Sequence, residues 1–356
     1  MELFIQPVAG SVSLRSLGRR WMILKLRNWT TLVALALCLS VSFYAKDLRR
    51  IVRAEKHHVG SPSVLWQQPD ISSRNLLYGP GGEAHQPRGT FRFLEEDFGG
   101  STPKFKVEDD KGIRWKVKLG KEAQPETSAT RLVWAVGYFT DEDYYLPELR
   151  VQGMKRLTRG QNFVSADGMI RGARLERHIK GEKKIGNWSW FKNPFAGTKE
   201  FNGLKIMMAL INNTDLKTEN NSIYDEEGLE PRYLVSDLGS CFGKTGNIIT
   251  HSDGNWPDYM KSRFIRRIRA EHLDFVMDTR PPFLFIFALP YYIDRTRIHQ
   301  IFKHIPRKDA KWIGELLSQL SEPQLKDAFR AGGFTPQQVD GYAGKIRERI
   351  AELNRL

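Results

Sequence analysis

Residues 215–220 read Asp-Leu-Lys-Thr-Glu-Asn, and residues 237–239 read Asp-Leu-Gly. The first stretch follows an apolar segment, 201–211, whose pattern predicts a helix, and the second follows a short strand predicted at 232–236. Two aspartates and an asparagine are therefore expected where regular elements end. Carboxylate and amide oxygens in such positions can hold Mg²⁺ and orient a hydroxyl group. The stretch favours a magnesium-dependent site for phosphoryl transfer.

This order of residues resembles the catalytic loop and metal-binding turn of the protein kinase superfamily, whose general form is H-R-D-L-x-x-x-N followed by D-F-G. The resemblance implies that Asp215 orients or deprotonates the acceptor hydroxyl and that Lys217 neutralises charge on the transferring phosphoryl group. It also implies that Asn220 and Asp237 hold Mg²⁺ on a bound ATP. Asn221 is an alternative to Asn220, because the pattern leaves one residue of register open.

Three features differ from conventional protein kinases. Asn213-Thr214 replaces the His-Arg pair, Leu238 stands where Phe is usual, and no Ala-Pro-Glu follows. The chain is therefore more similar to outlying branches such as lipid kinases, persistence-toxin kinases or secretory-pathway kinases. Two functions stay open. The first is an Mg²⁺-ATP-dependent kinase acting at a membrane on an unidentified hydroxyl of a protein, lipid or small molecule. The second is an inactive, membrane-tethered or secreted kinase-like binding scaffold.

Short alternating segments precede these motifs. Apolar and polar residues alternate at 90–93, 104–107 and 113–118, with turn residues between them. Period-two alternation predicts antiparallel strands, which the small lobe of a kinase would supply. Pro125 then opens a predicted helix with Glu126 in its first turn.

The resemblance also assigns a nucleotide-binding role to residues of this region. Lys118 ends the third predicted strand, in the place of the kinase lysine that contacts the α- and β-phosphates. Its implied acidic partner is Glu126, with Glu122 as the weaker candidate. The turn Gly99-Gly100-Ser101 would cover the phosphates with its backbone N–H groups.

The expected fold class is α+β, with a small antiparallel β-lobe, a larger and mainly helical lobe, and an N-terminal hydrophobic leader or anchor. Gln152-Gly153-Met154 is the predicted hinge between the lobes. Helical patterns follow at 258–277, 308–320, 322–331 and 335–355, and the apolar run 281–290 is predicted as core. The expected divisions are a leader (1–46), a linker and N-terminal wrap (47–88), the small lobe (89–153), the large lobe (154–306) and C-terminal helices (307–356).

The N-terminal segment predicts targeting rather than folding. Residues 30–45 are almost all apolar or small, and basic residues precede them, at Arg15, Arg19, Arg20, Lys25 and Arg27. This pattern is typical of a signal peptide, and it equally suits a short membrane anchor. A cleaved leader would place the protein outside the cytoplasm, whereas a retained one would hold it at a membrane.

The formal net charge of +14 favours acidic partners. Nucleotides and anionic lipids of a membrane surface fit this charge, whereas the absence of a nucleic-acid-binding motif argues against nucleic acid as the partner. Cys38 and Cys241 are the only cysteines, so the chain has neither a disulfide framework nor zinc-ligand spacing.

Overall fold

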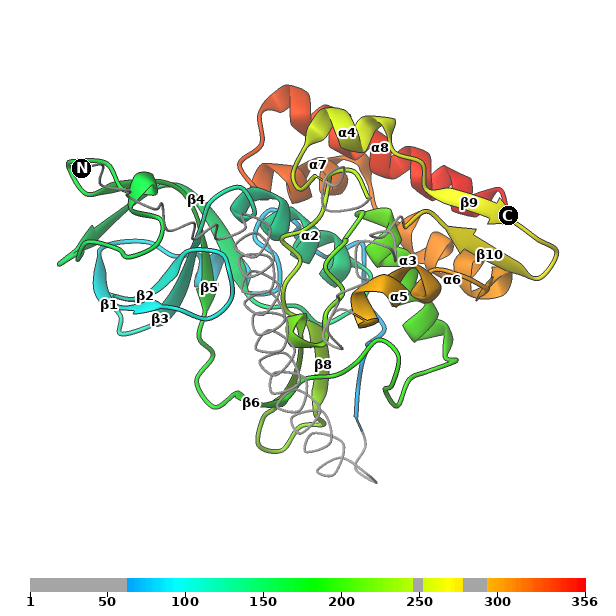
Figure 1. Ribbon diagram of the computed structural model, residues 1–356, viewed down its shortest axis with the longest axis horizontal. Helices are drawn as coiled ribbons and strands as arrows, with labels where there is room; N and C mark the ends of the chain where they lie inside the picture. The colour runs from blue at the N-terminus through cyan, green and yellow to red at the C-terminus, as the bar shows by residue number, and fades with distance from the viewer. Residues whose placement is uncertain (1–62, 246–251, 278–292) are drawn as a thin grey trace, which may run out of the picture.

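The computed structural model describes residues 63–245, 252–277 and 293–356 (Figure 1). Strands dominate up to residue 177, and helices dominate the second half of the chain. The mixed α+β class that the sequence predicts is therefore confirmed. The predicted leader (1–46) and the apolar run at 281–290 lie outside the described residues. Among the helices that the structure describes, none is both long and apolar enough to cross a membrane.

The first part of the structure is a closed barrel with the strand order β1-β2-β3-β5-β4, seen at the left of Figure 1. Neighbouring strands are antiparallel, except that β1 and β4 pair in parallel through Phe91 and Arg92 and so close the barrel. The strands are β1 (Phe91–Asp97), β2 (Lys104–Asp109), β3 (Arg114–Leu119), β4 (Asp143–Gln152) and β5 (Met169–Arg177).

The alternation along β3 decides which side chains leave the barrel. Trp115, Val117 and Leu119 are buried in the barrel core. Because successive side chains of a strand point to opposite faces, Lys116 and Lys118 lie on the outer face. The strand therefore presents basic groups to whatever packs beneath the barrel.

Helix α2 (Ala123–Ala135) follows β3 after a short turn and begins two residues before the predicted Pro125. It packs against β4, β5 and α7 (Glu322–Ala331). Its first turn carries Glu126, whose side chain is buried. Because only a short turn separates β3 from α2, Glu126 lies beside the outer face of the strand.

The barrel extends further along the chain than the sequence predicts. Strand β5 pairs with both β3 and β4, so the sheet of the small lobe runs to Arg177 rather than ending at 153. The segment Gln152-Gly153-Met154 connects β4 to β5 within the barrel and is not a hinge between lobes. The chain leaves the barrel only after β5.

The second part contains two small antiparallel sheets, of order β6-β7-β8 and β11-β10-β9. The strands are β6 (Lys183–Gly186), β7 (Asn221–Asp225), β8 (Arg232–Val235), β9 (Ile265–Ile268), β10 (His272–Phe275) and β11 (Ile305–Pro306). The helices are α3 (Lys199–Leu210), α4 (Trp256–Lys261), α5 (Ile293–Ile301), α6 (Arg307–Leu317), α7 and α8 (Pro336–Asn354). The single helix predicted at 258–277 is wrong, because α4 ends at Lys261 and two strands follow.

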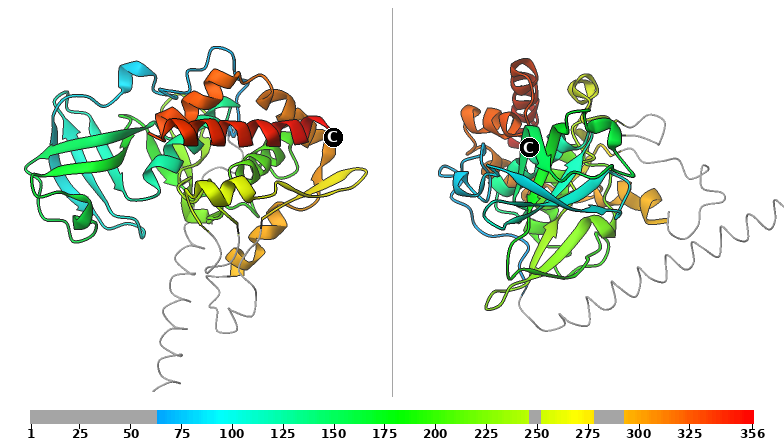
Figure 2. Two further views of the ribbon diagram at one scale, coloured as in Figure 1. Left: turned by 90° about the horizontal axis from the view of Figure 1, so that it is seen from above. Right: turned by 90° about the vertical axis from the view of Figure 1, so that its left-hand side faces the viewer.

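Helix α3 occupies the centre of the larger core. Phe201, Leu204 and Met207 are buried in one cluster with Ile313 of α6 and Tyr342 of α8. The C-terminal helices therefore belong to the same core as the helix that leads into residues 215–220 (Figure 2, where α8 is red). Residues 63–88 add Leu65, Ile71 and Leu76 to this core. The predicted N-terminal wrap is thus a packed part of the fold.

Candidate active site

Lys118 lies at the centre of the candidate site. Its Nζ is 2.8 Å from Glu126 Oε2 on α2 and 3.1 Å from Asp237 Oδ1, which follows β8. Glu122, the weaker sequence candidate, also contacts Nζ at 3.0 Å. Burial alone would lower the pKa of Lys118, but these three carboxylates outweigh it and raise the pKa above its ordinary value. The group is a permanently charged ammonium that joins the two halves of the molecule.

Asp237 keeps its negative charge despite partial burial. Burial would raise its pKa, but the charge and hydrogen bond of Lys118 and the backbone N–H of Gly239 lower it to about 2. A side chain at Gly239 would not fit, since its Cβ would lie 2.9 Å from Glu122 Cβ. The Gly of Asp-Leu-Gly therefore allows this turn to approach α2.

A buried arginine stands behind Glu126. Arg174 of β5 lies 3.6 Å from Glu126, and its Nε donates to Asp143 at 2.7 Å. Its Nη1 donates to Glu176 at 3.0 Å. Arg131 of α2 contacts Asp143 from the other side, at 2.9 Å. Positive and negative groups therefore alternate behind Glu126 and hold its side chain against Lys118. Buried charges need such partners, because an unpaired buried charge is strongly destabilising.

The loop 213–220 is held by hydrogen bonds within itself. The Nδ2 of Asn220 donates to the backbone oxygen of Asp215 at 2.7 Å and to its carboxylate at 3.1 Å. Lys217 Nζ lies 2.5 Å from the same carboxylate. The backbone N–H of Asp215 donates to Asn213 Oδ1 at 3.1 Å. The candidate catalytic acid and the candidate metal amide are therefore mutually oriented.

Asn220, not Asn221, faces Asp215. Asn221 is fully buried, and its Nδ2 donates to the backbone oxygen of Trp188 at 2.8 Å. The backbone oxygen of Asn220 accepts from the N–H groups of Ser236 and Asp237, at 2.8 and 3.3 Å. This connects the loop to the Asp237 turn, and the amide geometry favours Asn220 of the two alternatives.

These residues fit Mg²⁺ by their donor chemistry. An ionised carboxylate at Asp237 and the amide oxygen of Asn220 are hard ligands of the kind that Mg²⁺ uses with substrate phosphates and water. No cluster of three or more His, Cys, Asp or Glu side chains able to hold a metal ion occurs among the described residues.

The turn Gly99-Gly100-Ser101 joins β1 to β2. Arg159 donates to the backbone oxygen of Gly100 at 2.7 Å, and Asp97 accepts from the N–H of Gly99 at 2.8 Å. One residue further, Thr102 Oγ1 donates to Glu122 at 3.0 Å. The end of this turn therefore reaches the carboxylates around Lys118, although the N–H of Gly99 is already engaged.

Sequence reasoning did not identify Lys104, which is paired in register with Lys118 across β2 and β3. Burial, followed by the charge of Lys116, lowers the pKa of Lys104. A bound polyanion would relieve this repulsion. The alternation of the predicted strands could have identified Lys104 as a residue on the face of Lys118.

No protein-family model and no curated protein matches the chain. Solved structures of kinases do. The chain is similar to the Helicobacter pylori proinflammatory kinase CtkA at 13% identity, with 76% of this chain and 98% of that chain covered and a TM-score of 0.37. It is similar to the Golgi casein kinase at 9% identity, with 75% and 72% covered and a TM-score of 0.40. A structure of that kinase with Mn and ADP bound gives 10% identity, 75% and 73% covered and a TM-score of 0.35.

All three are likenesses to solved structures of kinases, at identities of 9–13%.

Proposed function

We propose that the protein is a Mg²⁺-dependent phosphotransferase that moves the γ-phosphoryl group of ATP to a hydroxyl acceptor. One observation carries the proposal. Lys118 contacts both Glu126 and Asp237, while Asn220, hydrogen-bonded to the Asp237 backbone, orients Asp215. This arrangement combines a phosphate-binding cation, two metal-binding oxygens and a carboxylate for the acceptor, which are the parts that phosphoryl transfer needs.

The donor side of the site binds the triphosphate. Lys118, with Lys104 beside it, would contact the phosphates, and Glu126 would keep Lys118 in place. A Mg²⁺ ion held by Asn220 and Asp237 would neutralise charge on the β- and γ-phosphates. Three carboxylates around one ammonium group leave an excess of negative charge, which supports the binding of a cation there.

The acceptor side depends on Asp215. Its carboxylate would take the proton of the acceptor hydroxyl as the acceptor oxygen forms a bond to the γ-phosphorus. The bond between that phosphorus and the oxygen bridging to the β-phosphate breaks, and ADP leaves with the electron pair. Lys217, which contacts Asp215 in the free protein, would then neutralise charge on the transferring group.

Two parts of the proposal rest on the sequence alone. The apolar segment at 30–45 would hold the site at a membrane with anionic lipids, and a protein, lipid or small molecule would supply the hydroxyl. Fractionation of full-length protein at high salt tests the first part. Recovery of the uncleaved chain in the soluble fraction would contradict it.

Nucleotide binding gives the direct test. Millimolar Mg²⁺-ATP should raise the Tm of the protein, because a ligand that binds only the folded state stabilises it. Asp237→Ala should remove most of this shift. Asp110→Ala, in the exposed turn between β2 and β3, is the matched control and should keep it.

The circular dichroism spectrum of Asp237→Ala without nucleotide should match that of the wild type. A wild-type Tm that does not change with Mg²⁺-ATP would contradict the phosphotransferase and favour the binding scaffold.

A further inference from the structure

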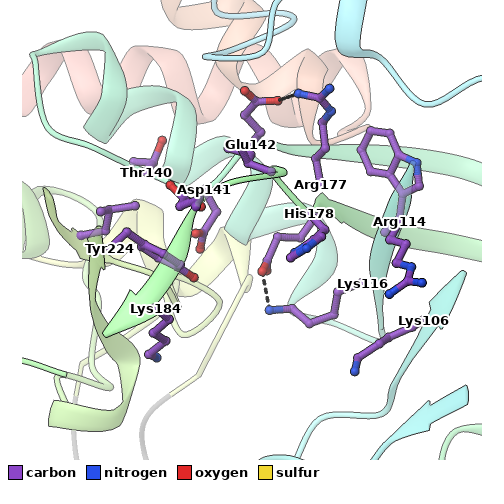
Figure 3. Close-up of a pocket in the computed structure, with 15 residues that line it drawn as sticks. Lys106, Arg114, Lys116, Thr140, Asp141, Glu142, Arg177, His178, Lys184 and Tyr224 are labelled. Atoms are coloured by element: carbon purple, nitrogen blue, oxygen red, sulfur yellow. Dashed lines mark hydrogen bonds and ion pairs between the residues drawn. The ribbon is translucent and has the colours of Figure 1, made fainter. Parts of the chain in front are cut away.

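A cavity lies under the barrel, further along β3 from Lys118. Its volume is about 340 Å³, and Figure 3 shows side chains from several elements around it. The roof comes from β2 and β3 through Lys106 and Lys116, and the floor comes from β7 and β8 through Tyr224 and Leu234. One wall is a turn that carries Asp141 and precedes β4.

This cavity continues the candidate active site. Lys116 is two residues before Lys118, so both side chains lie on the same face of β3, one step of about 7 Å apart. In the floor, Ser222 and Tyr224 follow Asn220 on alternate positions of β7, and Ser222 is paired with Leu234 of β8. A nucleotide whose phosphates contact Lys118 would extend its base into this cavity.

Most charged groups around the cavity are already paired. Lys116 donates to Glu176, and Arg177 lies 3.2 Å from Glu142. Asp141 differs, because its side chain makes no hydrogen bond or ion pair with any residue that the structure describes. Figure 3 shows Asp141 beside Tyr224 and facing the space between roof and floor. Because buried polar groups are normally hydrogen-bonded, we expect a bound ligand to supply a hydrogen-bond partner for this carboxyl group, and the cavity is large enough for a nucleotide base.

Burial and the nearby carboxylate of Glu176 raise the pKa of Asp141 well above its ordinary value. The charged groups that act on it come from several elements: Glu176 and Arg174 of β5, Lys116 of β3, Asp143 of β4 and Tyr224 of β7. Lys116 and Arg174 oppose the shift but do not cancel it. A neutral carboxyl offers one O–H donor and one carbonyl acceptor side by side.

We propose that Asp141 recognises the adenine base of the bound nucleotide by a pair of hydrogen bonds to the N1 and N6 edge. Adenine presents an acceptor at N1 beside the amino donor at N6, which complements a neutral carboxyl. An ionised carboxylate offers acceptors only, and it would instead face the N1 lone pair of adenine or accept from the N1–H and amino group of guanine. The inference rests on the proposed function and adds the recognition of the base.

The test measures dissociation constants of Mg²⁺-ATP and Mg²⁺-GTP for the full chain, between about pH 5 and pH 9, a range that spans a raised carboxyl pKa. The ratio of the two constants cancels proton binding by the triphosphate, which both nucleotides share. In the wild type, the preference for ATP should decrease as pH rises. Asp141→Leu should weaken ATP binding about tenfold at the acidic end, the loss of two neutral hydrogen bonds.

Asp141→Asn supplies the sharper variant. An amide keeps a donor and an acceptor side by side and does not titrate, so ATP affinity should persist and the pH dependence of the ratio should disappear. Asp110→Asn is the matched control and should behave as the wild type.

A constant wild-type ratio across this pH range, or unchanged ATP affinity in Asp141→Leu, would overturn the inference while leaving the phosphotransferase intact. A wild type that binds neither nucleotide would overturn both.

Discussion

The candidate site beneath β3 has two ends, one at Lys118 and one at Lys116, and the acids near them, Asp237 and Asp141, have pKa values shifted in opposite directions. Asp237 contacts Lys118, and its pKa is lowered to about 2. Asp141, in the turn that precedes β4, lies near the carboxylate of Glu176, and its pKa is raised well above the ordinary value. Burial disfavours the charge of both acids, so the direction of each shift is decided by the charged group that acts on the acid most strongly, which is the ammonium of Lys118 for Asp237 and the carboxylate of Glu176 for Asp141.

The difference separates two kinds of chemistry within one ligand site. An ionised acid can hold a metal ion that neutralises the charge of phosphates, whereas a neutral acid can donate a hydrogen bond to a base. Arg174 connects the two ends, because it contacts Glu126 at one and Glu176 at the other. Variants that act on one end only should therefore produce different defects.

The largest effect is expected for Asp215→Asn. The amide cannot accept the hydroxyl proton, so phosphoryl transfer should fall by about 10³-fold, within the range for loss of general base catalysis. The affinity for Mg²⁺-ATP should change little, because the proposed role of Asp215 is at the acceptor. Autophosphorylation measures the rate, and the Tm shift measures the affinity.

Asp141→Asn serves as the comparison in the same assay, since it alters the base end and should keep the transfer rate at saturating ATP. Equal rates for wild type and Asp215→Asn would remove Asp215 from the chemistry. A proportional loss of rate and nucleotide affinity would mean that the substitution disturbed the fold.

The next effect concerns Arg174, which is fully buried among Glu126, Asp143 and Glu176. Arg174→Met should destabilise the protein by about 3–5 kcal/mol, because it leaves buried carboxylates without their cation. Urea unfolding measures the free energy of unfolding. Arg171→Met, on the same strand but exposed, is the matched control and should change it by less than about 0.5 kcal/mol.

Arg174→Met in addition to Glu126→Gln should recover part of the lost stability, because fewer carboxylates stay unpaired. Identical stability of Arg174→Met and Arg171→Met would show that the charges near Arg174 contribute nothing to folding.

Local patterns in the sequence predicted the local parts of the fold. The alternation at 104–107 and 113–118 located β2 and β3, and the helices predicted at 322–331 and 335–355 correspond to α7 and α8. These two helices start with capping boxes at Ser321 and Thr335, a signal contained in the sequence itself. The hinge was misplaced because the pairing of β5 with β3 joins residues about sixty positions apart, which no local pattern records.

The residues of the candidate site also fall into two groups, those that local spacing identifies and those that only the folded structure identifies. Asp215, Asn220, Asp237 and Lys118 are spaced as a family pattern, and the structure brings them together. Arg174 and Asp141 follow no pattern, because their importance depends on which charges meet them in space. The sequence ranks Glu122 below Glu126, yet both contact Lys118, because only a short turn separates the strand from the helix.

The smallest effect is a pair of opposite slopes in the pH dependence of stability. The lowered pKa of Asp237 contributes stability that is present above about pH 4 and lost as pH falls toward about 2. The raised pKa of Asp141 acts in reverse, since the folded state holds its proton more tightly and stability falls as pH rises above about 4. Relative to the wild type, Asp237→Asn should therefore lose stability between pH 2 and pH 4, and Asp141→Asn should gain it from pH 4 upward. Because the Asp237 side chain is 42% exposed, solvent screening limits its part to less than about 1 kcal/mol.

Urea unfolding of the nucleotide-free proteins over this range measures both slopes. Slopes of the same sign in the two variants would mean that the two acids share one environment, and the contrast between the two ends of the candidate site would fail.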